Sequence, residues 1–488
     1  MGLGTSFGAR SGTGWNASLA IAGKVLFAAS CLCSGLSVLS VLSCTTQIDN
    51  AAQLPPAGIS ADAGGQSPAS ATGAVSCPGG GTTTISGTVV APTPARFGRA
   101  DPLYNALVYV PTTEVAAFSA GVSCDRCGSV SGAPRTTVLT GPDGRFTLPV
   151  GAAGRNVPLV IQIGRWRRQV VVPEVVACAD TPLPLELTRL PRNRSEGDIP
   201  AIAIATGQWD PFDCTLRKIG IDESEFTLPG GAGRVNMWTY KGHHLGPGTP
   251  YGDQLIGSAP TMNQYDIVIL PCDSADSKSP LLQRNLVDYA NKGGRIFLTD
   301  WSYSWLRDGQ RGTFENTVIW KSDLPAQQGI DFVGRVDLGF PKGVSFSQWL
   351  SVVGATGATS GQIPIHDPLA GFSIIEKVVP PTQSWIYTDG TTAGAVPSIQ
   401  NFTFNTPVGI ADDQQCGRVV FSQFHVASDS VGDGLFTTTA TPPGRLASAT
   451  FPSQCNARPM TPQEKALEFM LFDASSCIEA DRNSPIIP

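Results

Sequence analysis

The sequence has few charged residues and no extended cluster of basic ones. Asp, Glu, Lys and Arg make up 15% of the 488 residues, and the formal net charge is −6. About a quarter of the residues of an average soluble protein are charged. Arg165, Arg167 and Arg168 stand close together, in a stretch that we interpret as a local hairpin. Nucleic-acid binding needs many clustered cations to neutralise phosphates, so we expect no nucleic-acid partner.

The sequence also lacks the short motifs of common enzyme classes. It contains no G-x-S-x-G, H-E-x-x-H or P-loop pattern. Of the four histidines, His243 and His244 are adjacent in a loop rich in glycine and proline, and His366 stands alone. A zinc site needs three or four convergent ligands, so these three residues are expected in surface loops. The motifs predict no metal and no cofactor.

The N-terminus is typical of an exported protein. Residues 1–24 are polar or small with no acidic residue, residues 25–42 are apolar or small, and Val41-Leu42-Ser43-Cys44 resembles the bacterial lipobox, apart from Leu42. We therefore interpret residues 1–44 as a signal segment, with Cys44 as the lipidated first residue of an outer-membrane or cell-surface lipoprotein. Plain secretion and a retained anchor are the alternatives. Residues 45–76 are dominated by Ala, Gly, Pro and Ser and predict a flexible tether.

The chain has 12 cysteines, three of them in the signal segment. The nine others are Cys77, Cys124, Cys127, Cys178, Cys214, Cys272, Cys416, Cys455 and Cys477. In an oxidising compartment most of them should pair, and an odd number leaves one thiol over.

Three pairings are suggested by position. Cys77 and Cys178 bracket the first folded segment and could join its ends, while Cys124 and Cys127 could close a local loop. That C-x-x-C has no second C-x-x-C or histidine pair at suitable spacing, so a disulfide is favoured over zinc. In one interpretation Cys214 and Cys272 pair across neighbouring strand ends.

Residues 77–192 predict a β-sandwich. Alternating or apolar runs at 82–91, 106–111, 159–164, 168–172 and 183–188 read as short strands, and Pro142-Asp143-Gly144 reads as the turn of a hairpin over 136–148. The text TISGTVV, LYNALVYVP and TGPDGRFTLPV resembles the carboxypeptidase regulatory-like domain, a transthyretin-like (Ig-like) sandwich. That resemblance implies an accessory module without catalytic residues, and Asp143 is interpreted as a turn former.

Residues 198–478 predict an α/β domain with a parallel sheet. Buried runs at 199–207, 265–272, 295–300 and 417–426 alternate with helical patterns at 210–220, 279–291 and 461–472. The text YDIVILPC, NKGGRIFLTDWSYSW and CGRVVFSQFHV resembles the class I glutamine amidotransferase-like fold, which is flavodoxin-like. No cysteine stands at the sharp turn after 295–300, so amidotransferase chemistry is not implied.

The whole layout resembles a group of exported myxobacterial proteins that combine these two domains. Some of that group carry the name tryptophan synthase alpha chain. Such a protein needs eight strand and helix units in a barrel, which residues 77–192 and 320–410 do not supply.

Ligand sites in open α/β sheets form beyond the carboxyl ends of the strands. The candidates expected there are Asp210, Asp213, Cys214, Cys272, Asp273, Asp300, Trp301 and His425. One hypothesis is a hydrolase acting on an envelope carbohydrate or peptide, with Asp300 as base or metal ligand and His425 as its partner. Asp210, Asp273 and Trp301 are the candidate binding residues. The favoured hypothesis is a binding or scaffolding lipoprotein that contacts a glycan or another envelope protein, in which these side chains only stabilise the fold.

Overall fold

The computed structural model describes residues 77–207, 210–240, 248–272, 278–307, 314–321, 331–365, 374–391, 396–425, 455 and 457–487. The signal segment with Cys44, the tether, Asp273 and the histidines 243, 244 and 366 lie outside these residues, so their assignments stay predictions. Among the described residues no helix has the length and apolar character to span a membrane.

The first segment forms two sheets that pack on a common core. Strand β1 (Thr84–Thr88) pairs antiparallel with β4 (Arg145–Pro149) and parallel with β7 (Asp180–Pro182). The second sheet is antiparallel, in the order β3 (Thr137–Leu139), β2 (Leu107–Tyr109), β5 (Gly154–Ile163) and β6 (Trp166–Val175). Side chains such as Ile85, Phe146 and Ile161 from both sheets are buried in one hydrophobic cluster. This arrangement agrees with the predicted β-rich first segment.

The predicted hairpin over 136–148 is wrong in its pairing. The turn exists: Gly144 has φ 71 and donates its N–H to the carbonyl of Gly141 at 2.9 Å. The strands on either side, however, belong to different sheets, β3 with β2 and β4 with β1. A Cβ on residue 144 would lie 2.6 Å from the carbonyl oxygen of Val89, so the turn is pressed against the first sheet.

The three clustered arginines lie at the tight turn between β5 and β6, and each has a partner within the chain. Arg165 lies 2.9 Å from the carboxylate of Asp266, and Arg167 lies 2.8 Å from that of Asp198. Arg168 donates to a backbone carbonyl at 2.7 Å. These cations therefore join the hairpin to neighbouring segments.

The second segment is built on a ten-stranded sheet in the described part of the chain, in the order β15-β14-β17-β18-β19-β12-β11-β8-β10-β9. Six strands pair in parallel: β8 (Ile202–Thr206), β9 (Phe226–Thr227), β10 (Val235–Thr239), β11 (Ile267–Leu270), β12 (Arg295–Thr299) and β19 (Gly417–Ser422). Antiparallel strands extend it on one side: β14 (Phe332–Val336), β15 (Gln362–Ile365), β17 (Gln383–Thr388) and β18 (Ser398–Thr406). A separate pair joins β13 (Val318–Lys321) and β16 (Ile374–Val378).

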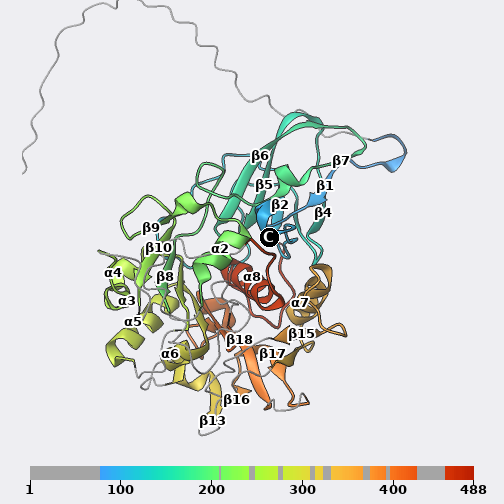
Figure 1. Ribbon diagram of the computed structural model, residues 1–488. Helices are drawn as coiled ribbons and strands as arrows, with labels where there is room; N and C mark the ends of the chain where they lie inside the picture. The colour runs from blue at the N-terminus through green and yellow to red at the C-terminus, as the bar shows by residue number, and fades with distance from the viewer. Residues whose placement is uncertain are drawn as a thin grey trace, which may run out of the picture. The chain divides into compact units, whose positions relative to one another are not determined.

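Helices cover this sheet (Figure 1). They are α2 (Phe212–Ile219), α3 (Gly252–Ile256), α4 (Ala259–Met262), α5 (Pro280–Asn291), α6 (Ser304–Arg307), α7 (Pro341–Val352) and α8 (Pro462–Ser475). The short α1 (Leu185–Thr188) belongs to the first segment and contacts β1, so the strand predicted over 183–188 is wrong. The predicted capping box of the last helix is present: the Thr461 side chain accepts from the N–H of Glu464, whose carboxylate accepts from the N–H of Thr461.

One hydrophobic cluster runs from the first segment into the second. Trp166 of β6 packs edge-on against Phe472 of α8, and Tyr104 stacks on Phe469. The indole N–H of Trp349 donates to the carbonyl of Pro102 at 2.6 Å. The boundaries 77–192 and 198–478 stay a prediction, but the two segments share a core around α8, drawn in red in Figure 1.

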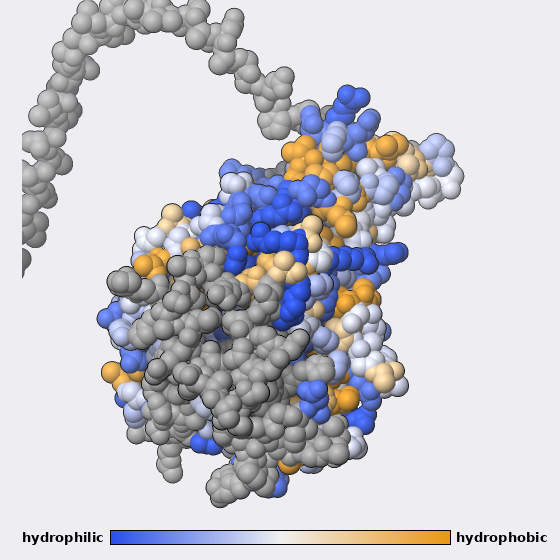
Figure 2. Space-filling model, in the orientation of Figure 1, coloured by the Kyte–Doolittle hydropathy of each residue, from blue (hydrophilic) through white to orange (hydrophobic). Residues whose placement is uncertain are grey.

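The face in Figure 2 carries apolar surface over the first segment, mixed with polar residues. Exposed apolar side chains of that segment include Val171, Val176 and Leu185. Val171 lies in β6, whose residues alternate between the core and solvent over part of its length.

The described residues contain four disulfides, and only one of the suggested pairings is among them. Cys77–Cys178 is confirmed. The local closure of Cys124 with Cys127 is wrong, because these residues pair with Cys416 and Cys477. Backbone hydrogen bonds from Val122 to Asn263 and from Cys127 to Ile478 hold the loop against the second segment. Each cysteine therefore faces a different distant partner.

The suggested pair Cys214–Cys272 is also wrong. Cys214, on α2, is bonded to Cys455, while Cys272 is buried and takes part in no disulfide. The odd cysteine that the count requires is therefore Cys272.

Candidate functional site

Four of the predicted residues meet at the carboxyl edge of the parallel strands. Asp210 lies between β8 and α2, Cys272 two residues after β11, Asp300 directly after β12, and His425 three residues after β19. All four are buried: Cys272 0%, Asp300 1%, Asp210 4% and His425 6% exposed. Neighbouring parallel strands end at the same edge of a sheet, so residues far apart in sequence are brought together there.

His425 lies between two carboxylates. Its Nδ1 is 3.2 Å from Oδ1 of Asp210, and its Nε2 is 3.3 Å from Oδ2 of Asp300. The side-chain amide of Gln463, on α8, donates to the backbone carbonyl of His425 at 3.0 Å. The imidazole is therefore oriented by Asp210 on one side and presented to Asp300 on the other.

Asp210 is held by the ends of two strands. Its Oδ2 accepts from the hydroxyl of Thr299, at the end of β12, and from the N–H of Cys272 at 3.4 Å. The same N–H also lies 2.9 Å from Oγ1 of Thr299. With Oδ1 at His425 and Oδ2 at these donors, both oxygens of Asp210 have partners.

Asp300 occupies a sharp turn between β12 and a 3-10 helix (Asp300–Tyr303). Its φ of 35 lies in the left-handed region, which costs a residue with a Cβ about 1–2 kcal/mol. The hydroxyl of Ser302 fixes the turn by donating to the carbonyl of Pro271 at 2.7 Å. Such strained strand-to-helix turns project a reactive side chain in several enzyme families.

Burial is the main influence on the pKa of Asp300. Burial raises the pKa of its carboxyl above the ordinary value, and the neighbouring His425 acts in the opposite direction. Its Oδ1 is buried and has no hydrogen-bond partner among the described residues. Its Oδ2 contacts Sγ of Cys272 at 3.4 Å.

Cys272 is the residue whose role the sequence did not indicate. Cys272, Asp300 and His425 each offer one ligand atom, and these atoms all lie within 4.8 Å of one another. The odd number of cysteines and the position of Cys272 at a strand end could have indicated a thiol at the site. The suggested disulfide with Cys214 led to the opposite expectation.

Two other candidates, Trp301 and Asp213, are packed within the fold and are not part of this cluster. Trp301 is partly buried and packs against the hydrophobic cluster on the sheet's other side, and Asp213 is buried in α2. Close packing shapes the site as well: a Cβ on Gly207 would lie 2.0 Å from the carbonyl oxygen of Cys272. No protein-family model matches the chain, and no curated protein matches it significantly.

Proposed function

We propose that the chain is an exported hydrolase that activates a water at Asp300 and His425. The single observation that carries this proposal is the buried Asp210–His425–Asp300 array, with Asp300 at a strained turn beyond a parallel strand. Asp300 and His425 are the catalytic residues. Asp210 is a positioning residue, because a carboxylate on Nδ1 fixes the tautomer that leaves Nε2 with its lone pair toward Asp300.

The reaction class is hydrolysis at an electrophilic carbon of an envelope carbohydrate or peptide. A water next to Asp300 and His425 would lose a proton to Nε2 of His425 as its oxygen attacks the carbon, and the imidazolium would pass that proton to the leaving group as its bond to carbon breaks. Groups that hold the water in a buried, oriented position lower the cost of this step.

The strand arrangement supports a flavodoxin-like fold for the second segment. Numbered along the chain, the parallel strands β8, β10, β11, β12 and β19 follow the spatial order 2-1-3-4-5, which is the flavodoxin-like order. In the amidotransferase-like proteins that the sequence resembles, the sharp turn carries the nucleophile, and Asp300 stands there in this chain. The two packed sheets of residues 77–192 likewise support a transthyretin-like accessory module.

The disulfides support an extracytoplasmic location. Together with the signal segment, they favour a lipoprotein anchored through Cys44 and held off the membrane by residues 45–76. Mass spectrometry of the mature protein tests this part: an acylated Cys44 at the N-terminus is the expected result, and an unprocessed or unacylated N-terminus contradicts it.

The depth of the site favours a second candidate. With Asp300 and His425 only 1% and 6% exposed, the array can serve to hold strand ends together in a protein that binds or scaffolds a glycan or an envelope protein. The two candidates predict different effects of substitution. If the protein is a scaffold, substitutions at the site should change its stability, and neither the wild type nor the variants should catalyse hydrolysis.

The test is hydrolysis by the purified, oxidised protein on a panel of chromogenic glycosides, esters and peptide amides and on cell-wall fragments. We expect Asp300→Asn and His425→Gln to lower kcat at least about 100-fold. Asp210→Asn should change the pH profile and lower kcat while leaving KM nearly unchanged. Asp288→Asn, an exposed residue of α5, is the matched control. Hydrolysis unchanged in Asp300→Asn, or no hydrolysis of any substrate by the wild type, would overturn the proposal.

A further inference from the structure

We propose that Cys272, Asp300 and His425 form a zinc site. The ligand atoms are Sγ of Cys272, a carboxylate oxygen of Asp300 and Nε2 of His425. This inference deepens the proposed hydrolase and rests on it for the role of the metal, but the binding of the metal is a separate property that can be measured without a substrate.

The distances between the ligand atoms match a tetrahedral zinc centre. With Zn–S at about 2.3 Å and Zn–N and Zn–O at about 2.0 Å, a tetrahedron has a sulfur–oxygen edge of about 3.5 Å and a nitrogen–oxygen edge of about 3.3 Å. The corresponding separations are 3.4 Å from Cys272 Sγ to Asp300 Oδ2 and 3.3 Å from His425 Nε2 to the same oxygen. The third pair, Sγ of Cys272 and Nε2 of His425, lies within 4.8 Å, against an ideal edge of about 3.5 Å. One ion can therefore bind all three atoms once this pair moves to the tetrahedral spacing.

The residues around the ligands complete the pattern of a metal site. A zinc-bound histidine almost always donates its other ring N–H to a carboxylate or carbonyl. Asp210 supplies that carboxylate, at 3.2 Å from Nδ1 of His425. Its second oxygen accepts from Thr299, so Asp210 orients the histidine, and a fourth position on the metal would be left for water. Three protein ligands with one open position are the arrangement of catalytic zinc.

The charges at the site and their burial also favour a bound cation. Two carboxylates and a thiol surround one imidazole in a buried space, and Oδ1 of Asp300 is buried with no hydrogen-bond partner among the described residues. Buried carboxylates are costly without a compensating cation. On zinc binding the thiol of Cys272 loses its proton to solvent and the Zn–S bond forms. Thiolate and imidazole ligands favour zinc over magnesium or calcium.

The disulfide pattern keeps this thiol available. Cys214, the suggested partner of Cys272, is bonded to Cys455 instead. With zinc in place, Asp300 and His425 act as ligands, and the metal supplies the acidity that releases a proton from the bound water.

The experiment is metal titration of the full-length oxidised protein after treatment with a chelator. Cobalt(II) replaces zinc as the probe, because a Co(II)–thiolate bond gives a near-ultraviolet charge-transfer band and tetrahedral Co(II) gives intense visible bands. We expect one equivalent to bind with both signatures and zinc to displace it. Cys272→Ser should remove the charge-transfer band, and Asp210→Asn should weaken binding about 10- to 100-fold. Asp288→Asn and His366→Gln are the controls that should bind as the wild type.

The outcomes separate the two proposals. No cobalt binding by the wild type, or a spectrum unchanged in Cys272→Ser, overturns the zinc site. If Cys272→Ser does not fold, the wild-type charge-transfer band and the affinity of Asp210→Asn decide the matter. Tight zinc binding without hydrolysis of any substrate overturns the hydrolase alone. Hydrolysis that survives complete removal of metal overturns the catalytic role of the zinc, while the cobalt titration still decides whether the site binds a metal.

Discussion

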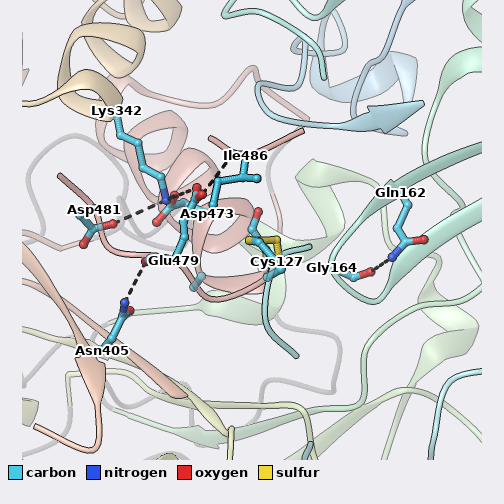
Figure 3. The surroundings of a disulfide bond; sticks show 12 residues. Cys127, Gln162, Gly164, Lys342, Asn405, Asp473, Glu479, Asp481 and Ile486 are labelled. Atoms are coloured by element: carbon cyan, nitrogen blue, oxygen red, sulfur yellow. Dashed lines mark hydrogen bonds and ion pairs between the residues drawn. A yellow bond between two sulfur atoms is a disulfide. The ribbon is translucent and has the colours of Figure 1, made fainter. Parts of the chain in front are cut away.

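Replacing Lys342 with methionine should destabilise the protein strongly, because this lysine is the centre of a buried ionic cluster. Its Nζ lies 3.2 Å from Asp473 and from Glu479 and 3.6 Å from Asp481 (Figure 3). Arg418 contacts two of the same carboxylates. Three carboxylates thus share two cations. Methionine would leave only Arg418 among the cations of the described residues, at Asp473 and Asp481, and would remove the cation paired with Glu479.

The expected cost follows from burial. The side chain of Lys342 is 2% exposed, and removing one partner of a buried ion pair costs about 3–5 kcal/mol, since the other charge stays buried without compensation. For roughly 400 folded residues the entropy of unfolding near the midpoint is about 0.85 kcal/mol per kelvin, so Tm should fall by about 4–6 °C. The assay is urea unfolding with the disulfides intact, checked by calorimetry. Lys377→Met, at an exposed position of β16, should change stability by less than about 0.5 kcal/mol.

The same cluster gives the effect a pH dependence. Burial acts to raise the pKa of Asp481, but Arg418 and Lys342 hold that pKa below its ordinary value. A carboxyl with a lowered folded-state pKa adds stability above its unfolded pKa of about 3.9, and this stability is lost as the pH falls. The deficit of Lys342→Met should therefore be largest at neutral pH and shrink below about pH 4. A loss under about 1 kcal/mol at pH 7, or a loss that does not change with pH, would refute the reasoning.

Three further predictions follow from single contacts. Changing Cys77 and Cys178 together to alanine opens a loop with a sequence separation of 101 and should cost at most about 4.7 kcal/mol in denaturant unfolding, and no measurable loss would contradict it. Gly207→Ala should cost about 1–3 kcal/mol, because the Cβ would lie 2.0 Å from the carbonyl oxygen of Cys272, whereas Gly151→Ala, with nothing within 4 Å, should cost far less. Hydrogen bonds from Arg189 lower the pKa of Glu196 to about 2, so its stabilisation should be present above about pH 4.3 and be lost as the pH falls toward 2. Glu196→Gln should therefore cost about 1 kcal/mol at pH 7 after solvent screening and almost nothing near pH 2, as urea unfolding at both pH values would show.

Much of the second segment could be predicted from the sequence because its strands are buried on both faces. Continuous apolar runs identified β8, β11, β12 and β19, and helix signals identified α8 down to its capping box. The antiparallel strands β14 to β18 escaped prediction. They lie in residues 332–406, where apolar and polar residues are mixed. Strands β17 and β18 are close in sequence, but β14 pairs with β17 across the intervening β15 and β16.

The disulfides show a limit of a different kind. The pair Cys77–Cys178 could be predicted because it closes one segment on itself. The partners of Cys124 and Cys127 could not, because their loop docks on a segment about 300 residues away through backbone hydrogen bonds that any sequence could make. The same limit applied to the site. Asp210, Asp300 and His425 were recognisable as strand-end residues. Whether Cys272 keeps its thiol could not be predicted, because that depends on which cysteine pairs with Cys214.

The first segment supports the site through α8. This helix holds His425 by the hydrogen bond from Gln463, and two residues further along it Lys465 pairs with Asp101 of the first segment. Trp166 then packs against the far end of the same helix. Because nearly all residues of α8 are buried, a change at its contact with the first segment should shift Gln463, whose side chain holds the carbonyl of His425. The first segment therefore forms part of the structure on which the geometry of the site depends.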